Sequence, residues 1–247
     1  MINAVALHFA HDSSRTILHD IGFALESGAI LGLVGANGAG KSTLLALLAG
    51  LLQPVSGRLE IADLDASTQS SAIRRLTALV LQEADLTIIG STIAEDICLG
   101  LPPERHPEAL ALAARLDLPD PQTPVHILSH GQKRKLCLAA ALLRKPRILL
   151  LDEPFAGLDY PGIREIRAML QANQAAGLTQ VIAVHDLEPL ADLAHLWLVL
   201  AHGRQAAFGS PQQVFPGLEA MDVRPPCSWK AGLGIIPWDA PEQAPRH

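Results

Sequence analysis

Hydrophobic and polar positions follow two alternating patterns along the chain. Short apolar runs typical of buried strands are separated by longer segments with helical periodicity. The predicted strands are Val5–Phe9, Thr16–Leu25, Ala29–Val34, Arg58–Ile61, Leu76–Leu81, Arg147–Leu151, Val181–Val184, Leu196–Ala201 and Gln205–Phe208. The predicted helices are Lys41–Leu52, Ser91–Leu99, Pro107–Leu116, Ser129–Leu143 and Pro161–Ala176. This alternation predicts an α/β fold with a mostly parallel sheet.

Two stretches depart from the alternation. Residues 83–145 carry helical patterns separated by Pro-containing loops, which predicts a helical subdomain inserted into one α/β domain over residues 1–215. From Pro211 onward the chain holds 7 of its 18 prolines, so we expect this end of the chain to be irregular and to lie on the surface, with a proline-rich C-terminal tail over residues 216–247. In that tail, Trp229 and Trp238 could cover an apolar surface, contribute to a dimer contact or be loosely ordered.

Composition excludes several classes of protein. With 247 residues, 49% of them hydrophobic, the chain can bury a sizeable core without metal or disulfide. The three cysteines are widely spaced, which argues against a disulfide framework or a zinc site. We expect no signal peptide and no membrane span, because a basic-apolar leader and a run of 18 apolar residues are both absent. The net charge of −6, without a basic run, predicts no nucleic-acid partner.

A glycine-rich segment between a predicted strand and a predicted helix matches the pattern GxxxxGK[ST]. Backbone N–H groups of such a loop wrap the phosphates of a nucleotide, Lys41 would neutralise phosphate oxygens, and the Ser42 hydroxyl would bind Mg²⁺. The alternative is a chance match, expected in roughly 1% of chains of this length. The residues predicted to bind the nucleotide here are Gly35, Ala36, Asn37, Gly38, Ala39, Gly40, Lys41, Ser42 and Thr43.

An acidic pair follows the apolar strand that ends at Leu151. Asp152 is placed to hold Mg²⁺, because ligands of open α/β sheets bind at the carboxyl ends of the strands. Glu153 beside it is suited to accept a proton from an attacking water. An ordinary strand ending in an acidic turn is the alternative. Together with the glycine-rich loop, however, this pair predicts a nucleotide site that holds Mg²⁺ and activates a water.

The segment Leu128–Gln132, Leu-Ser-His-Gly-Gln, resembles the signature sequence of ATP-binding cassette (ABC) ATPases. Ser129 alone could simply cap a helix. The other motifs of that family follow in order: Gln82 resembles its Q-loop glutamine, Ala156–Asp159 its D-loop and His185 its switch histidine. The resemblance covers residues 3–215 and implies a P-loop NTPase with a RecA-like core, antiparallel N-terminal strands and an inserted helical subdomain.

The resemblance also implies residue roles. Two cassettes would face each other head to tail, with Ser129, Gly131 and Gln132 belonging to the partner's ATP site, where Ser129 and Gly131 contact the γ-phosphate. Glu153 would be the general base, His185 would contact the γ-phosphate, and Gln82 would sense Mg²⁺ and water. Asp159 would communicate across the dimer. The partner cassette could be a second copy or a paralogue.

Two positions depart from the family pattern. His130 stands where most such ATPases have glycine, and it adds bulk at the rim of the γ-phosphate site. His11 stands where the family has an aromatic residue that stacks on adenine. Its imidazole could stack in the same way, or it could be a solvated loop residue.

The segment Glu83–Ile97 resembles energy-coupling-factor (ECF) ATPases, in which a polar start leads into a helix of the pattern T-(V/I)-x-E-D. This branch implies uptake of cobalt, nickel or a vitamin such as biotin. Its partners would be a transmembrane coupling protein and a substrate-binding membrane protein, which hold the ATPase on the cytoplasmic face of the membrane. Four apolar residues could contact the coupling protein or form the helical subdomain's own core: Leu86, Ile88, Ile89 and Ile93.

Three alternatives remain open beside this interpretation. The chain could serve another ABC importer or exporter, or it could be a soluble ABC ATPase acting on nucleic acid or ribosomes. A P-loop kinase outside the ABC family is opposed by the signature segment and by His185.

Overall fold

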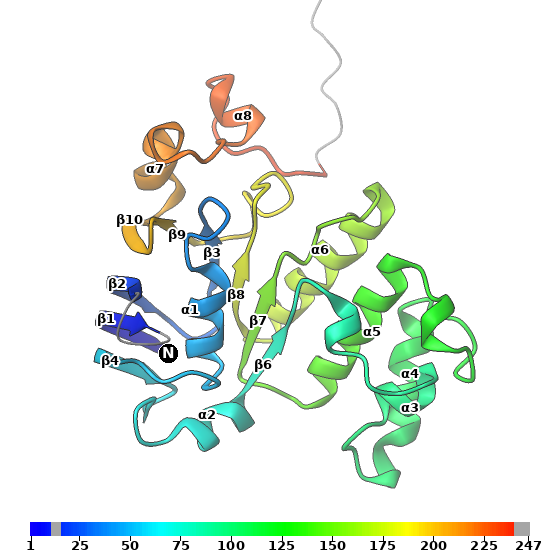
Figure 1. The fold of residues 1–247 in the computed structure, drawn as a ribbon. Helices are drawn as coiled ribbons and strands as arrows, with labels where there is room; N and C mark the ends of the chain where they lie inside the picture. Colours follow the sequence, from blue (N-terminus) through cyan, green and yellow to red (C-terminus); the bar gives the residue numbers. More distant parts are fainter. Residues whose placement is uncertain (11–15, 240–247) are drawn as a thin grey trace, which may run out of the picture.

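The computed structural model describes residues 1–10 and 16–239, and within these ranges ten strands form one sheet (Figure 1). The strand order is β5-β4-β1-β2-β10-β9-β3-β8-β7-β6. The core strands β9, β3, β8, β7 and β6 pair in parallel, whereas β1, β2, β4 and β5 pair antiparallel. The strands are β1 Ile2–Ala10, β2 Thr16–Leu25, β3 Ile30–Val34, β4 Ser56–Ile61, β5 Leu64–Asp65, β6 Thr77–Val80, β7 Ile148–Asp152, β8 Thr179–Ala183, β9 Leu196–Ala201 and β10 Arg204–Gly209. The predicted α/β fold with antiparallel N-terminal strands is confirmed.

The central strands β3, β7 and β8 are buried at every position. Side chains of a strand point alternately to its two faces, so each strand feeds two cores. Leu31 and Leu33 of β3 pack in the first core with α1 and the antiparallel strands. Ile30 and Val34 pack in the second core with α6. Continuous apolar runs are therefore required in these strands, because both faces are covered.

The helices occupy three places around the sheet (Figure 1). Helix α1 lies in the first core and α6 in the second, while α3, α4 and α5 share a third core beyond β6. The boundaries of the inserted subdomain and of the domain over residues 1–215 stay predictions. The helices are α1 Lys41–Leu48, α2 Ser70–Leu76, α3 Ile93–Ile97, α4 His106–Arg115, α5 His130–Leu143, α6 Tyr160–Ala175, α7 Pro211–Val214 and α8 Cys227–Lys230, with 3₁₀ turns η1 Ala84–Leu86, η2 Pro103–Arg105, η3 Val125–Ile127 and η4 Phe215–Met221.

Helices α1 and α2 differ from the sequence prediction. Helix α1 ends at Leu48 rather than Leu52, because Gly50 has φ of 69° and passes close to α2, where a Cβ would lie 2.9 Å from the Ser70 carbonyl oxygen. Helix α2 itself was not predicted. Its single buried residue is Ile73, so its sequence carries little apolar periodicity.

The segment that begins at Pro211 was predicted to be irregular, but its first part is helical and partly buried, which corrects that prediction. Helix α7 and turn η4 place Val214, Phe215 and Leu218 in the second core. The Phe215 ring lies with its centroid 5.3 Å from Trp197 and 5.3 Å from Trp229. Proline opens both elements, where its missing N–H is not needed. Proline content therefore marked helix starts here as well as irregular backbone.

The last described residues lie against α6. The Trp238 ring stacks on Tyr160 at 4.8 Å, and the Arg167 guanidinium lies 5.1 Å from the Trp238 centroid. Arg167 is buried and donates to both carboxylate oxygens of Asp192, each at 2.8 Å. Of the roles left open for the two tail tryptophans, contact with an apolar surface of this chain is the one seen.

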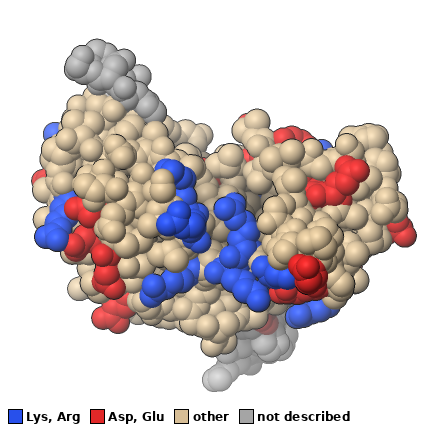
Figure 2. Space-filling model, turned by 90° about the horizontal axis from the view of Figure 1, so that it is seen from below, with Lys and Arg blue, Asp and Glu red and all other residues tan. Residues whose placement is uncertain are grey.

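The face at the amino ends of the parallel strands carries a group of Lys and Arg side chains, flanked by acidic ones (Figure 2). Within residues 1–10 and 16–239, no helix has the length and apolar character needed to cross a membrane.

We expect Phe215→Ala to lower the free energy of unfolding by about 3–5 kcal/mol, because it empties a site between two aromatic rings. Urea unfolding followed by circular dichroism measures this difference. Leu233→Ala in the same tail is the control, since Leu233 is 67% exposed and should change stability little. A loss below about 1 kcal/mol for Phe215→Ala would contradict a core role for this segment.

Candidate active site

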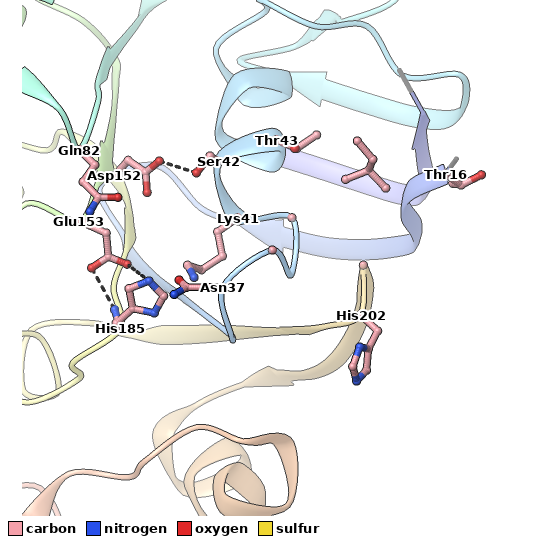
Figure 3. Close-up of a pocket in the computed structure, with 14 residues that line it drawn as sticks. Thr16, Asn37, Lys41, Ser42, Thr43, Gln82, Asp152, Glu153, His185 and His202 are labelled. Atoms are coloured by element: carbon pink, nitrogen blue, oxygen red, sulfur yellow. Dashed lines mark hydrogen bonds and ion pairs between the residues drawn. The ribbon is translucent and has the colours of Figure 1, made fainter. Parts of the chain in front are cut away.

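A cavity of ≈ 760 Å³ lies at the carboxyl ends of the parallel strands (Figure 3). The glycine-rich loop lines one wall, and three other segments bring Gln82, the acidic pair and His185 to the opposite side. The structure thus brings together residues far apart in the sequence. The predicted site residues that line the cavity are Asn37, Gly38, Gly40, Lys41, Ser42, Thr43, Gln82, Asp152, Glu153 and His185.

The loop between β3 and α1 is held tightly at its first glycine. Gly35 has φ of 151°, and a Cβ there would lie 2.2 Å from the carbonyl oxygen of Leu200, so only glycine fits. Ala39 points into the first core, and neither it nor Ala36 lines the cavity. The predicted role of Gly35, Ala36 and Ala39 in binding the nucleotide therefore concerns the backbone of the loop, because none of the three lines the cavity.

Lys41 opens α1 with its side chain folded into the loop. Its Nζ donates to the carbonyl oxygens of Gly35 at 2.8 Å and Ala36 at 3.4 Å. Burial lowers the pKa of Lys41, while the nearby Glu153 and Asp152 carboxylates oppose that shift. A largely desolvated ammonium group at a helix start is a strong site for phosphate oxygens.

Ser42 and Asp152 meet across the cavity floor. The Ser42 hydroxyl donates to Oδ2 of Asp152 at 2.6 Å, and Gln82 lines the same cavity. Hydroxyl, carboxylate and amide oxygens form the all-oxygen donor set that suits Mg²⁺. Ser42, Asp152 and Gln82 therefore fit the predicted Mg²⁺. A metal site of another kind, built from three or more His, Cys, Asp and Glu side chains, is not present in residues 1–10 and 16–239.

Glu153 is buried, and this burial raises the pKa of its carboxyl to about 7. Its Oε2 accepts a hydrogen bond from the His185 backbone N–H at 3.1 Å. Its Oε1 lies 3.3 Å from Nε2 of His185 but accepts no hydrogen bond within the described chain. A buried carboxylate with a free oxygen is suited to take a proton from water.

The local backbone fixes this pair. Glu153 has φ of 49°, in the left-handed region, and its N–H donates to the carbonyl oxygen of Ala183 at 3.0 Å. Such a conformation stores strain and is common at functional sites. Burial lowers the pKa of His185, which favours the neutral form of its ring. The two side chains face each other in Figure 3.

The signature residues and Asp159 lie outside this cavity. Ser129 caps α5 by accepting from the Gln132 N–H at 3.2 Å, and the Gln132 side chain accepts from the Ser129 N–H at 2.9 Å. Asp159 caps α6 through the Gly162 N–H at 3.0 Å. In the single chain these residues have a capping role. Their role, with Gly131, in a partner's ATP site stays a prediction.

A second cavity of ≈ 380 Å³ shares Gln82 with the first. It lies between the segment after β6, the start of α5, and Gly157. His130 lines this second cavity, and its ring lies 3.4 Å from where a Cβ of Gly157 would be. The bulk added by His130 therefore faces the D-loop segment of its own chain.

Four residues that line the main cavity were not predicted: Thr16, Ile17, His202 and Gly203. They come from the start of β2 and from the turn between β9 and β10. A hydrogen bond joins these two segments: the His19 N–H donates to the Gly203 carbonyl oxygen at 2.7 Å. No local motif marks them, because only the β2–β10 pairing makes them neighbours. His11, predicted to contact adenine, lies outside the described residues.

Comparisons with known proteins identify the family of this chain. The family model described as ABC transporter matches residues 18–156. The cobalt import ATP-binding protein CbiO of Rhodobacter capsulatus is 37% identical over 241 residues, which cover 92% of this chain and 85% of the relative. The energy-coupling factor transporter ATP-binding protein EcfA of Methanocaldococcus jannaschii is 32% identical and covers 87% and 81%, respectively.

A solved structure gives the same result. It is cbiO1 from Clostridium perfringens, described as part of the ABC transporter complex cbiONQ, and it superposes with a TM-score of 0.76 at 29% identity. The match covers 89% of this chain and 92% of that one. The resemblance inferred from the motifs is confirmed: the chain belongs to the ABC transporter family and is an ATP-binding ATPase.

Proposed function

We propose that this chain is the ATPase subunit of an energy-coupling-factor type importer that takes up a transition-metal ion, cobalt or nickel, or a vitamin such as biotin. The observation that carries the proposal is the likeness, over most of both chains, to relatives named for cobalt import and for energy-coupling factors. The exposed apolar residues beside Gln82, described below, support it independently.

The proposed hydrolysis follows from the cavity. The glycine-rich loop and Lys41 bind the phosphates of ATP. Ser42, Asp152 and Gln82 would hold Mg²⁺, which when bound offsets charge on the phosphate oxygens. Glu153 accepts the proton of the attacking water through its free oxygen. His185, held beside Glu153, contacts the γ-phosphate.

The proposed active unit is a dimer. Ser129 and Asp159 are exposed, cap their helices and lie outside the cavity that holds Lys41 and Glu153. A second cassette, either a copy or a paralogue, would bring its own signature residues to this cavity. Each ATP then lies between two chains, and hydrolysis depends on their closure.

The proposed docking site for the membrane coupling protein lies beside Gln82. Leu86 and Ile89 are 70% and 76% exposed, which is unusual for large apolar side chains so close together. Ile93 is fully buried in the third core, and Ile88 packs between the second and third cores. Of the four residues predicted from the sequence, Leu86 and Ile89 therefore remain as docking contacts.

In this assembly the chain lies on the cytoplasmic face of the membrane and contacts the coupling protein, which pairs with a substrate-binding membrane protein. A mild-detergent pull-down from native membranes tests the proposal. Recovery of a coupling protein and a small binding protein supports it, and the second protein identifies the cargo class. Recovery of an exporter instead would assign the ATPase to another ABC transporter. Recovery of ribosomal or DNA-bound partners would assign it to the soluble ABC ATPases, and the group of Lys and Arg side chains in Figure 2 would then be the surface to test.

Lys41→Ala should lower ATP turnover by about 100-fold or more, because it removes the cation that the loop holds against the phosphates. Phosphate release at saturating ATP and Mg²⁺ measures this loss. Lys145→Ala is the control, since Lys145 is 71% exposed and does not line the cavity. Retained turnover in Lys41→Ala would contradict the assigned phosphate site.

Glu153→Gln should accumulate an ATP-bound dimer, because it keeps the shape of the site but cannot take the proton. Size exclusion with light scattering, in ATP and Mg²⁺, should show twice the monomer mass. The double variant Lys41→Ala with Glu153→Gln should stay monomeric. If Glu153→Gln alone remains monomeric with ATP bound, the proposed closure is wrong.

The double substitution Leu86→Asp with Ile89→Asp should release the chain from the membrane complex, because two charges replace the apolar contact. Basal ATPase activity of the isolated chain should stay within about twofold, since neither residue lines the cavity. Val55→Asp, at a position that is 67% exposed, provides a matched control. Full retention of the double variant in the detergent pull-down would rule out docking at these residues.

A further inference from the structure

Side chains of helix α5 contact backbone carbonyl groups of the segment around Gln82. The guanidinium Nη1 of Arg134 donates to the carbonyl oxygen of Leu81 at 2.9 Å, directly before Gln82. One turn further along α5, the Cys137 thiol contacts the carbonyl oxygen of Ala84 at 3.7 Å. Two buried side chains of one helix therefore hold the backbone on both sides of Gln82.

A third contact is exposed. Lys133 forms an ion pair with Asp85 at 2.6 Å, but Asp85 is 76% exposed, so this pair contributes little. Arg134 is 1% exposed, so the donor of its bond to Leu81 is buried. The contacts of the buried Arg134 and Cys137 are therefore the ones able to fix the position of the loop, and that of Arg134 is the charged one.

The burial of the Arg134 guanidinium costs free energy of folding. Burial lowers the pKa of its guanidinium, although the negative charges of Asp152 and Glu153 oppose that shift. Its Nε and Nη2 have no hydrogen-bond partner within residues 1–10 and 16–239. These two donors form one complete edge of the guanidinium fork. A buried cation with a single hydrogen bond destabilises the fold relative to an apolar side chain of similar size.

Arg134 also connects the helix of the signature segment with the segment that carries Gln82. It lies on the helix that begins with the signature segment at Ser129, and its bonded carbonyl precedes the glutamine that lines the ATP cavity. We propose that Arg134 is a positioning residue, which holds the Leu81 carbonyl so that Gln82 and the signature helix move as one body. A displacement of α5 on closure of the dimer then shifts Gln82 in the chain's own site.

The inference rests on the proposed role of Gln82 and makes a specific kinetic prediction. Arg134→Met should lower kcat about tenfold, the factor expected when a charge-assisted hydrogen bond holding a site residue is lost. KM for ATP should change less than about twofold, because the phosphate loop is untouched. The Tm should stay within about 4 °C, because loss of the Leu81 bond is offset by removal of a buried unpaired charge.

Two variants separate positioning from general damage. Arg134→Lys keeps the charge and one donor nitrogen, and it should recover about threefold of the lost kcat. Lys135→Met removes the same charge from the neighbouring position, where the side chain donates to the Leu116 carbonyl oxygen and pairs with Glu165. This control should keep wild-type kcat within about twofold.

A double-mutant cycle decides the mechanism. If Arg134 acts through Gln82, adding Arg134→Met to Gln82→Ala should lower kcat by less than about twofold further. Additive losses, an equal loss in Lys135→Met, or unchanged kcat in Arg134→Met would overturn the inference. Wild-type kcat in Gln82→Ala alone would instead refute the proposed role of Gln82, so the two failures are distinguishable.

Discussion

The register of the three central strands determines where the chemistry occurs. Leu33 of β3 pairs with Ala183 of β8, and Ala183 pairs with Asp152 of β7, so these residues form one row across the sheet. The glycine-rich loop, Glu153 and His185 follow this row at the same edge. Because side chains alternate along a strand, a slip of one residue would turn Asp152 away from Ser42.

The same edge gathers charged groups that the fold would otherwise keep in water. Lys41, Asp152, Glu153 and Arg134 are all buried near one another. Desolvation disfavours the charged form of Lys41, Glu153 and Arg134. It therefore lowers the pKa of Lys41 and Arg134 and raises the pKa of Glu153. Mutual attraction between the two cations and the two carboxylates offsets part of this penalty. The arrangement sacrifices stability for a site in which electrostatic interactions are strong and water is limited.

The sequence predicted the parts of the site that are local. The loop from Gly35 to Ser42 and the acidic pair are contiguous motifs, so their spacing alone indicates their chemistry. Other parts depend on contacts between distant segments and could not be predicted in this way. Helix α2 carries one buried residue, Phe215 is buried against the distant Trp197, and His202 joins the cavity through the pairing of β10 with β2. The contact of Arg134 with Leu81 has no sequence signature for the same reason.

The pairing of β2 with β10 has a consequence for how the protein is made. Strand β2, Thr16–Leu25, leaves the ribosome long before its partner β10, Arg204–Gly209. The wall of the cavity made by Ile17 and Gly203 therefore cannot form until β10 has been synthesised. Contacts between such distant segments form slowly, because a long loop must close first. During translation the phosphate loop is complete long before the pocket around it, so the nascent chain cannot assemble the full nucleotide site until β10 has been added.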